Sequence, residues 1–168
     1  MVFSYYHRLS SKRKRIYRKS DSIEAVPLPR ARELQPLIPQ LVTALHANDR
    51  TATEFICRTI VAGIAQSLQA PPVRVRVLSV RPSESWGELH GLYVPAAGTS
   101  SAVITLWMRT AKHRRVVAFR SFLRTLLHEL CHHLDYEFLK LEESFHTEGF
   151  YKRESSLFHQ LVSALPAE

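Results

Sequence analysis

Three residues in the last third of the chain have the types and the spacing of a metal centre. Residues 128–132 read His-Glu-Leu-Cys-His, so two histidines lie four positions apart with a glutamate directly after the first. On a helix, side chains four residues apart project from one face, and two such imidazoles can bind a single zinc ion. Glu129 then lies beside the metal, where its carboxylate can take a proton from water. The motif predicts zinc chemistry with Glu129 as the general base.

The motif requires a helix, and the residues around it predict one that begins near Phe119. Leucines recur at the spacing of one helical face, at positions Leu123, Leu126, Leu127, Leu130 and Leu134. At about 100° per residue, His128 and His132 project almost opposite this apolar stripe. His133 lies about 100° round the helix from His132, which excludes it as a partner ligand. Chance alone would produce the motif about 0.03 times in a chain of this composition, so coincidence is a poor explanation.

A catalytic zinc ion needs three protein ligands and one open position, so a third ligand must come from elsewhere in the chain. A second amphipathic helix is predicted from about Ser144 to Leu165. His146 and Glu154 fall on its apolar face, whereas Glu148 and His159 do not. A histidine on an apolar face is more often a core residue than a ligand, but here a metal-binding pair is close in sequence. We therefore expect His146 as the third ligand and Glu154 in reserve, because zinc also accepts carboxylates.

The motif and the residues after it resemble the SprT-like zinc metallopeptidases, with the WLM-type peptidases as near relatives. The resemblance is carried by His128-Glu129-x-x-His132, thirteen intervening residues and His146-x-x-x-Phe150. It covers about Thr125 to Leu157, and Thr147-Glu148 replaces the Gly-Pro that usually follows the family's third histidine. The resemblance implies a zinc-dependent endopeptidase with the three histidines as ligands and Glu129 as base. It also implies a protein or peptide substrate, held along a strand edge above the cleft, and an association with DNA-bound proteins.

Other residues can support this chemistry. Asp135 lies on the metal face three positions after His132, where it could orient a ligand imidazole, although a capping or surface carboxylate is the alternative. An electrophile that stabilises the oxyanion is usually needed, and the candidates are Tyr136, Tyr151 and Arg153. We expect the motif helix to end between Leu134 and Glu137, because the chain must turn back to bring His146 to the ion.

Two other classes of function compete with a peptidase. In a nucleic-acid-binding module the zinc would be structural, and a fourth ligand such as Glu154 would close the site. An adaptor would keep the fold and the metal and cut nothing. The presence of Glu129 argues against an adaptor, since a site that only binds has no need of the base.

The length and composition fit one globular domain. The chain has 168 residues, of which 45% are hydrophobic, and no apolar run approaches the roughly 18 residues of a transmembrane helix. Cys57 and Cys131 are expected to be buried thiols without a disulfide, which fits a reducing compartment. No signal-peptide pattern is evident. We expect a cytoplasmic monomer that does not bind membranes, with a location at the nucleoid or in the nucleus left open.

Positive charge is concentrated at the start of the chain. The first 20 residues contain no acid and seven basic residues, against a net charge of +8 for the whole chain; the seven are Arg8, Lys12, Arg13, Lys14, Arg15, Arg18 and Lys19. Such arms commonly contact DNA, and the alternatives are a solvated tail or an arm packed on the domain's own acids. We therefore divide the chain into a basic arm and linker, 1–29, and a metallopeptidase domain, 30–168. Removing residues 1–20 should weaken DNA binding and spare peptidase activity, because no motif residue is lost.

The remaining segments predict helices followed by strands. Helices are expected at about 36–47 and 51–69, and strands at about 73–79, 88–94 and 102–108. Because the connections are short, the strands should form an antiparallel meander before the motif helix. The predicted fold class is α+β, a zincin-like single domain with helices packed on a small antiparallel three-stranded sheet. Val103–Trp107 is the candidate substrate-binding edge, unless it is an interior strand.

Overall fold

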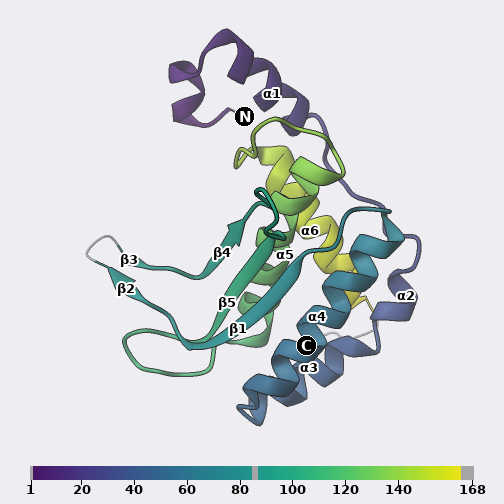
Figure 1. Cartoon of the computed structure of the whole chain (residues 1–168), viewed down its shortest axis with the longest axis vertical. Coiled ribbons are helices and arrows are strands. Elements are labelled where there is room, and N and C mark those ends of the chain that lie inside the picture. Colours follow the sequence, from purple (N-terminus) through teal and green to yellow (C-terminus); the bar gives the residue numbers. More distant parts are fainter. Residues whose placement is uncertain (1, 85–86, 164–168) are drawn as a thin grey trace.

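The computed structural model describes residues 2–84 and 87–163, which fold into helices and a small three-stranded sheet (Figure 1). In chain order the elements are η1 (Ser4–Arg8), α1 (Ser11–Asp21), α2 (Ala31–Leu34), α3 (Leu37–His46), α4 (Arg50–Ser67), β1 (Arg74–Val80), β2 (Ser83–Glu84), β3 (Gly87–Glu88), β4 (Gly91–Val94), β5 (Val103–Arg109), α5 (Phe119–Glu137) and α6 (Glu148–Val162). The prediction of a single domain of helices packed on three strands is confirmed in this general form. No helix in the described ranges is long and apolar enough to cross a membrane.

The core lies between the helices and one face of the sheet. Alternate residues of β1 and β5 belong to it, namely Val75, Val77, Ile104, Leu106 and Met108. Helices α4 and α5 pack against the sheet, α3 packs on α4, and α6 packs on α5. Arg74 and Arg76 project from the opposite, exposed face of β1. This alternation is the expected pattern of a strand with one buried face. Cys57 and Cys131 are buried free thiols in the core, as predicted.

The predicted antiparallel meander is wrong. The strand order is β1-β5-β4, and β1 pairs with β5 in parallel, from Arg74 opposite Val103 to Val80 opposite Arg109. On its other side, β5 pairs with β4 in the antiparallel sense. After β1 the chain leaves the sheet through the β2–β3 ribbon and returns as β4, so β5 inserts between the two earlier strands (Figure 1). β5 is buried along most of its length, and a strand buried on both faces favours a central position.

This order also corrects the position of the exposed edge. Residues Val103–Trp107 lie in β5, which is paired on both sides, so the predicted substrate edge is an interior strand. The free edge beside the motif helix belongs instead to β4, which pairs only with β5 among the described residues.

The motif helix α5 ends at Glu137, within the predicted range. Backbone N–H groups of Phe138 and Leu139 donate to the carbonyl of Leu134, which closes the last turn. Lys140 then adopts the left-handed conformation, with φ of 54°. This residue turns the chain back towards the metal face, because a left-handed residue after a helix reverses its direction.

The second predicted helix begins later than expected. α6 starts at Glu148 instead of Ser144, and the side chain of Thr147 caps it by accepting a hydrogen bond from the N–H of Phe150. His146 therefore lies in the loop before α6 and not on a helical face. The predicted end at Leu165 falls outside the described residues.

The N-terminal helix α1 packs on the domain. It lies beside the connection between α5 and α6, at the top of the view in Figure 1. Tyr17 and Ser20 of α1 are fully buried by this packing. The proposed division at residue 30 stays a prediction, but these contacts tie residues 3–24 closely to the rest of the chain.

Candidate metal centre

Three histidine side chains converge on one point beside the sheet. His128 and His132 lie one turn apart on α5, and His146 reaches them from the loop before α6. The Nε2 atom of His146 is 3.0 Å from the Nε2 atom of each of the other two. Nitrogens bound to tetrahedral zinc at about 2.0–2.1 Å are separated by about 3.3 Å. The three predicted histidines are therefore close enough to hold a metal ion.

The outer nitrogen of His128 faces a carboxylate. Its Nδ1 atom is 3.2 Å from Oε2 of Glu154, whose other oxygen accepts a hydrogen bond from Nη1 of Arg124 at 3.2 Å. Because an ionised carboxylate can only accept, the proton of a neutral His128 belongs on Nδ1. The lone pair on Nε2 then points at the histidine cluster. Glu154, the predicted reserve ligand, thus lies on the far side of the ring from the candidate ion.

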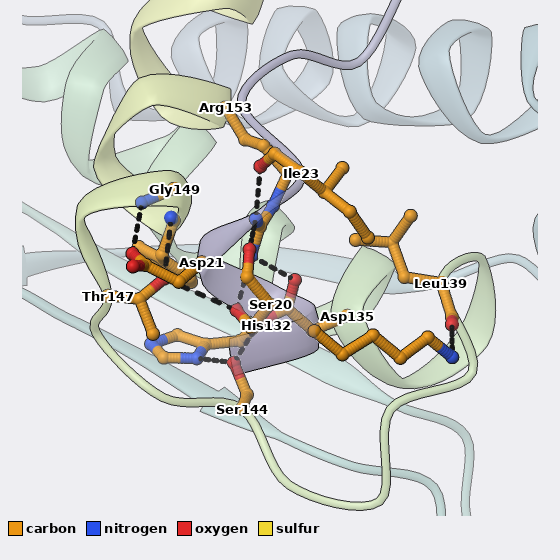
Figure 2. A network of polar contacts seen from close by, with 12 residues as sticks. Ser20, Asp21, Ile23, His132, Asp135, Leu139, Ser144, Thr147, Gly149 and Arg153 are labelled. Carbon is orange, nitrogen blue, oxygen red and sulfur yellow. Dashed lines mark hydrogen bonds and ion pairs between the residues drawn. The ribbon is translucent and has the colours of Figure 1, made fainter. Parts of the chain in front are cut away.

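The outer nitrogen of His132 meets a serine that sequence reasoning did not identify. The Oγ atom of Ser144 is 2.7 Å from Nδ1 of His132 and donates to Oδ2 of Asp135, also at 2.7 Å (Figure 2). With its own proton given to Asp135, the hydroxyl can only accept from Nδ1 of His132. Asp135 therefore orients the His132 imidazole through Ser144. This arrangement is typical of metal-binding histidines, whose second nitrogen donates to a fixed acceptor.

The electrostatics of the cluster favour neutral imidazoles. Burial, together with the charges of His128 and His146, lowers the pKa of His132 to about 3. Burial and His128 also lower the pKa of His146 below its ordinary value. The neutral ring is the form that binds a metal ion, so His132 and His146 are ready for a cation at neutral pH.

An aromatic floor lies under the three imidazoles. The ring of Phe150, which is fully buried, has its centroid 4.8–5.1 Å from those of all three histidines. Phe150 is the aromatic residue four positions after His146 in the motif. It limits the motion of the rings and keeps water from that side of the cluster.

Glu129 is held between α5 and the free edge of β4. Its carboxylate accepts a hydrogen bond from the backbone N–H of Tyr93, and the residue is only 8% exposed. Burial raises the pKa of Glu129, although the charge of His128 and the Tyr93 N–H act in the opposite direction. A Cβ atom on Gly91 would lie 2.6 Å from Oε1 of Glu129, so only glycine permits this approach. A glycine inside a predicted strand often marks a place where another group comes close to the backbone, so the sequence contained a signal for this contact.

The histidines and Glu129 line one cleft of about 640 Å³. Its walls are the β4 edge and the polar face of α5, and Tyr136, one of the three oxyanion candidates, also lines it. Tyr151 is exposed, with its ring centroid 5.8 Å from that of His146. Arg153 is unsuitable, because it is 1% exposed and its Nη2 atom donates to Asp135 at 2.9 Å. Its role is structural, and the prediction of Arg153 as a residue that stabilises the oxyanion is wrong.

The basic residues proposed to contact DNA divide into two groups. Lys12 and Arg13 form ion pairs with Glu142 and Glu143, in the loop between α5 and α6. In addition, Nζ of Lys19 donates to the carbonyl of Leu139 at 3.4 Å. These three cations face the domain, so the alternative of an arm packed on its own acids describes them better.

The other predicted DNA contacts, Lys14, Arg15 and Arg18, form no ion pair with that loop among the described residues. Arg18 donates to the Tyr6 hydroxyl, and Lys14 lies over the Tyr6 ring. Arg15 is exposed.

No family model, curated protein or solved structure matches the chain.

Proposed function

We propose that the protein is a zinc-dependent endopeptidase with a zincin-like fold. The observation that carries the proposal is the convergence of three Nε2 atoms in the same cleft as the carboxylate of Glu129. Three imidazoles, two of them with the outer nitrogen held by a partner, are a ligand set that suits zinc. The resemblance of residues 125–157 to SprT-like peptidases supports the same assignment.

The roles of the side chains follow from this arrangement. Zinc bound by His128, His132 and His146 would supply a Lewis acid for the scissile carbonyl and for water. Glu129 takes the proton of the attacking water and passes it to the leaving amine. The N–H of Tyr93 fixes the carboxylate for this task.

The substrate that suits the cleft is an extended peptide. The edge of β4 borders the cleft, and an unpaired edge can bind a further strand through main-chain hydrogen bonds. Such binding selects an unfolded or extended segment and reads its side chains weakly. Leu92 of β4 is 41% exposed and gives this edge one apolar contact.

The geometry favours catalytic over structural zinc. Structural sites have four protein ligands, but the described residues provide only the three histidines as one metal-binding group. Glu154 interacts with the outer nitrogen of His128, where it supports a ligand and does not close the site.

Zinc content and cleavage of casein test the proposal together. Wild type should carry one zinc ion and cleave, whereas Glu129→Gln should keep the zinc and lose cleavage, because only the base is removed. His146→Ala should lose most of the zinc, and His159→Ala, which changes an exposed histidine of α6, should behave as wild type. A Glu129→Gln protein that cleaves casein at the wild-type rate would exclude the mechanism.

We also propose that outward-facing cations of the N-terminal segment contact DNA. Arg8 and Arg15 are exposed, and the described residues provide no ion pair for either. Replacing both with glutamine should reduce the slope of log K against log[salt] by about 2, since each phosphate contact contributes about 0.9. Unchanged DNA binding in a salt titration, with zinc content intact, would reject this surface.

A further inference from the structure

We infer that the N-terminal segment, residues 3–24, is a positioning element of the metal site and not an independent arm. This inference rests on the proposed zinc site. It concerns the loop of residues 138–147, which connects α5 to α6 and carries Ser144 and His146. The N-terminal segment contacts this loop on both sides of His146 and reaches His132 through buried side chains.

The first contact is with the third ligand itself. The hydroxyl of Tyr5 donates to the backbone carbonyl of His146 at 2.9 Å. The preceding residue, Phe145, lies in an aromatic cluster with Tyr5 and Tyr17, at ring-centroid distances of 6.5 and 6.0 Å. The guanidinium of Arg13 lies 5.3 Å from the centroid of the Phe145 ring. The backbone that presents the His146 imidazole is therefore fixed by residues more than 120 positions earlier in the chain.

The second contact is with the start of α6, directly after His146. The N–H of Gly149 donates to Oδ1 of Asp21 at 3.0 Å. A Cβ atom on Gly149 would lie 2.4 Å from the carbonyl oxygen of Asp21 and 2.7 Å from that of Ser20. The cap residue of the same helix, Thr147, lies 3.4 Å from Ser20, hydroxyl to hydroxyl, in a fully buried position. The first turn of α6 and the end of α1 are thus in direct backbone contact.

The third contact leads to a second ligand. Nη1 of Arg153 donates to the carbonyls of Ser20 and Ile23 at 2.6 Å each, while Nη2 donates to Oγ of Ser20 and to Oδ1 of Asp135 at 2.9 Å (Figure 2). Asp135 accepts from Ser144, which in turn accepts from His132. A continuous chain of hydrogen bonds therefore joins α1 to the ring of His132.

The hydrogen bond of Tyr5 and the buried contacts, and not the surface ion pairs, carry this positioning. The ion pairs of Lys12 with Glu142 and of Arg13 with Glu143 have side chains that are 38–64% exposed. Exposed pairs of this kind contribute little, because water and salt screen them. Arg153 and Ser20 are at most 1% exposed, so breaking their hydrogen bonds leaves buried polar groups without partners.

These contacts reverse one expectation from the sequence. Removing residues 1–20 deletes no motif residue, and on that ground it was expected to spare peptidase activity. The structure predicts that this truncation weakens zinc binding. The loop would lose its contacts with Tyr5 and Tyr17, and Arg153 would lose its hydrogen bonds to Ser20.

A single hydroxyl tests the inference without the risk of unfolding the protein. Tyr5→Phe keeps the aromatic ring and removes only the hydrogen bond to the His146 carbonyl. Tyr6→Phe is the matched control, because its hydroxyl accepts from Arg18 within the same segment. The full chain is titrated with zinc in competition with a chromophoric chelator, and the urea midpoint of the metal-free protein is measured alongside.

We expect Tyr5→Phe to weaken zinc binding about 3- to 10-fold, which is less than the roughly 10- to 100-fold effect of a partner that contacts the ligand ring itself, because Tyr5 contacts only the backbone of His146. Tyr6→Phe should bind zinc as wild type does, and both variants should have similar urea midpoints. Zinc binding by Tyr5→Phe within twofold of the control would overturn the inference and leave the zinc site standing. A wild-type chain that binds no zinc would overturn the proposed function, and this inference with it.

Discussion

Replacing Gly91 with alanine should separate catalysis from metal binding. A Cβ atom at this position would lie 2.6 Å from Oε1 and 2.8 Å from Cγ of Glu129, and 2.8 Å from Cγ2 of Thr125. To restore an ordinary contact of 3.4 Å, the carboxylate must retreat by about 0.8 Å or β4 must lift away from α5. A displacement of about 1 Å can reduce a rate 100-fold, which is about 2.7 kcal/mol of transition-state stabilisation. None of the three atoms nearest to the new methyl group belongs to a histidine, so the affinity for zinc should change less than about twofold.

The assay compares casein cleavage per bound zinc in Gly91→Ala and in wild type. Val94→Ala is the control, because it changes an exposed residue of the same strand and should leave the rate unaltered. Cleavage by Gly91→Ala within about threefold of wild type would refute the idea that the β4 backbone positions Glu129. Loss of zinc from this variant would show instead that the strand also supports the histidines.

Two further predictions concern the ligands. Ser144→Ala removes the acceptor of the His132 ring and a donor to Asp135, so zinc affinity should fall about 10- to 100-fold. A chelator competition measures the affinity. Ser156→Ala is the control, because it removes a hydroxyl of α6 that lies outside this network. In the metal-free protein the pKa of His132 is about 3 when folded, against an ordinary value of 6.5. The unfolded chain therefore binds more protons between these values, and the free energy of unfolding should fall as pH drops below 6.5. Urea titrations at several pH values measure this fall. If the free energy of unfolding depends on pH as strongly in His132→Gln as in wild type, the fall does not come from His132.

The motif helix was the most predictable part of the fold, because local and tertiary requirements agree there. Leucine spacing placed its buried face, and the need to return the chain to the metal placed its end at Glu137 against a helix-favouring sequence. His146 was predicted as a ligand for a reason that the structure does not support, since it lies in a loop and not on a helical face. The capping preference of Thr147, followed by an acidic first-turn residue, was the local signal for the true start of α6.

The strand order of the sheet was harder to predict from the sequence, because it depends on which strand becomes most buried. Short connections favour neighbouring strands, and this rule gave the wrong order. The nearly continuous apolar run of Val103–Met108, in contrast to the alternation in β1, was the signal of a central strand. The contacts of Ser144 and Arg153 follow from tertiary packing, which no local pattern in one sequence reveals.

The strand order and the cleft have a common physical origin. Because the buried strand β5 takes the centre, the shorter and more exposed β4 is left at the edge beside α5. An edge strand keeps backbone donors that the sheet does not use, and one of them, the N–H of Tyr93, is available for Glu129. In the predicted meander the second strand would lie between the other two, with its backbone groups committed to the sheet on both sides. The parallel pairing of β1 with β5 is therefore a condition for holding a buried carboxylate beside the three histidines, and the error in topology and the missed role of Gly91 have the same cause.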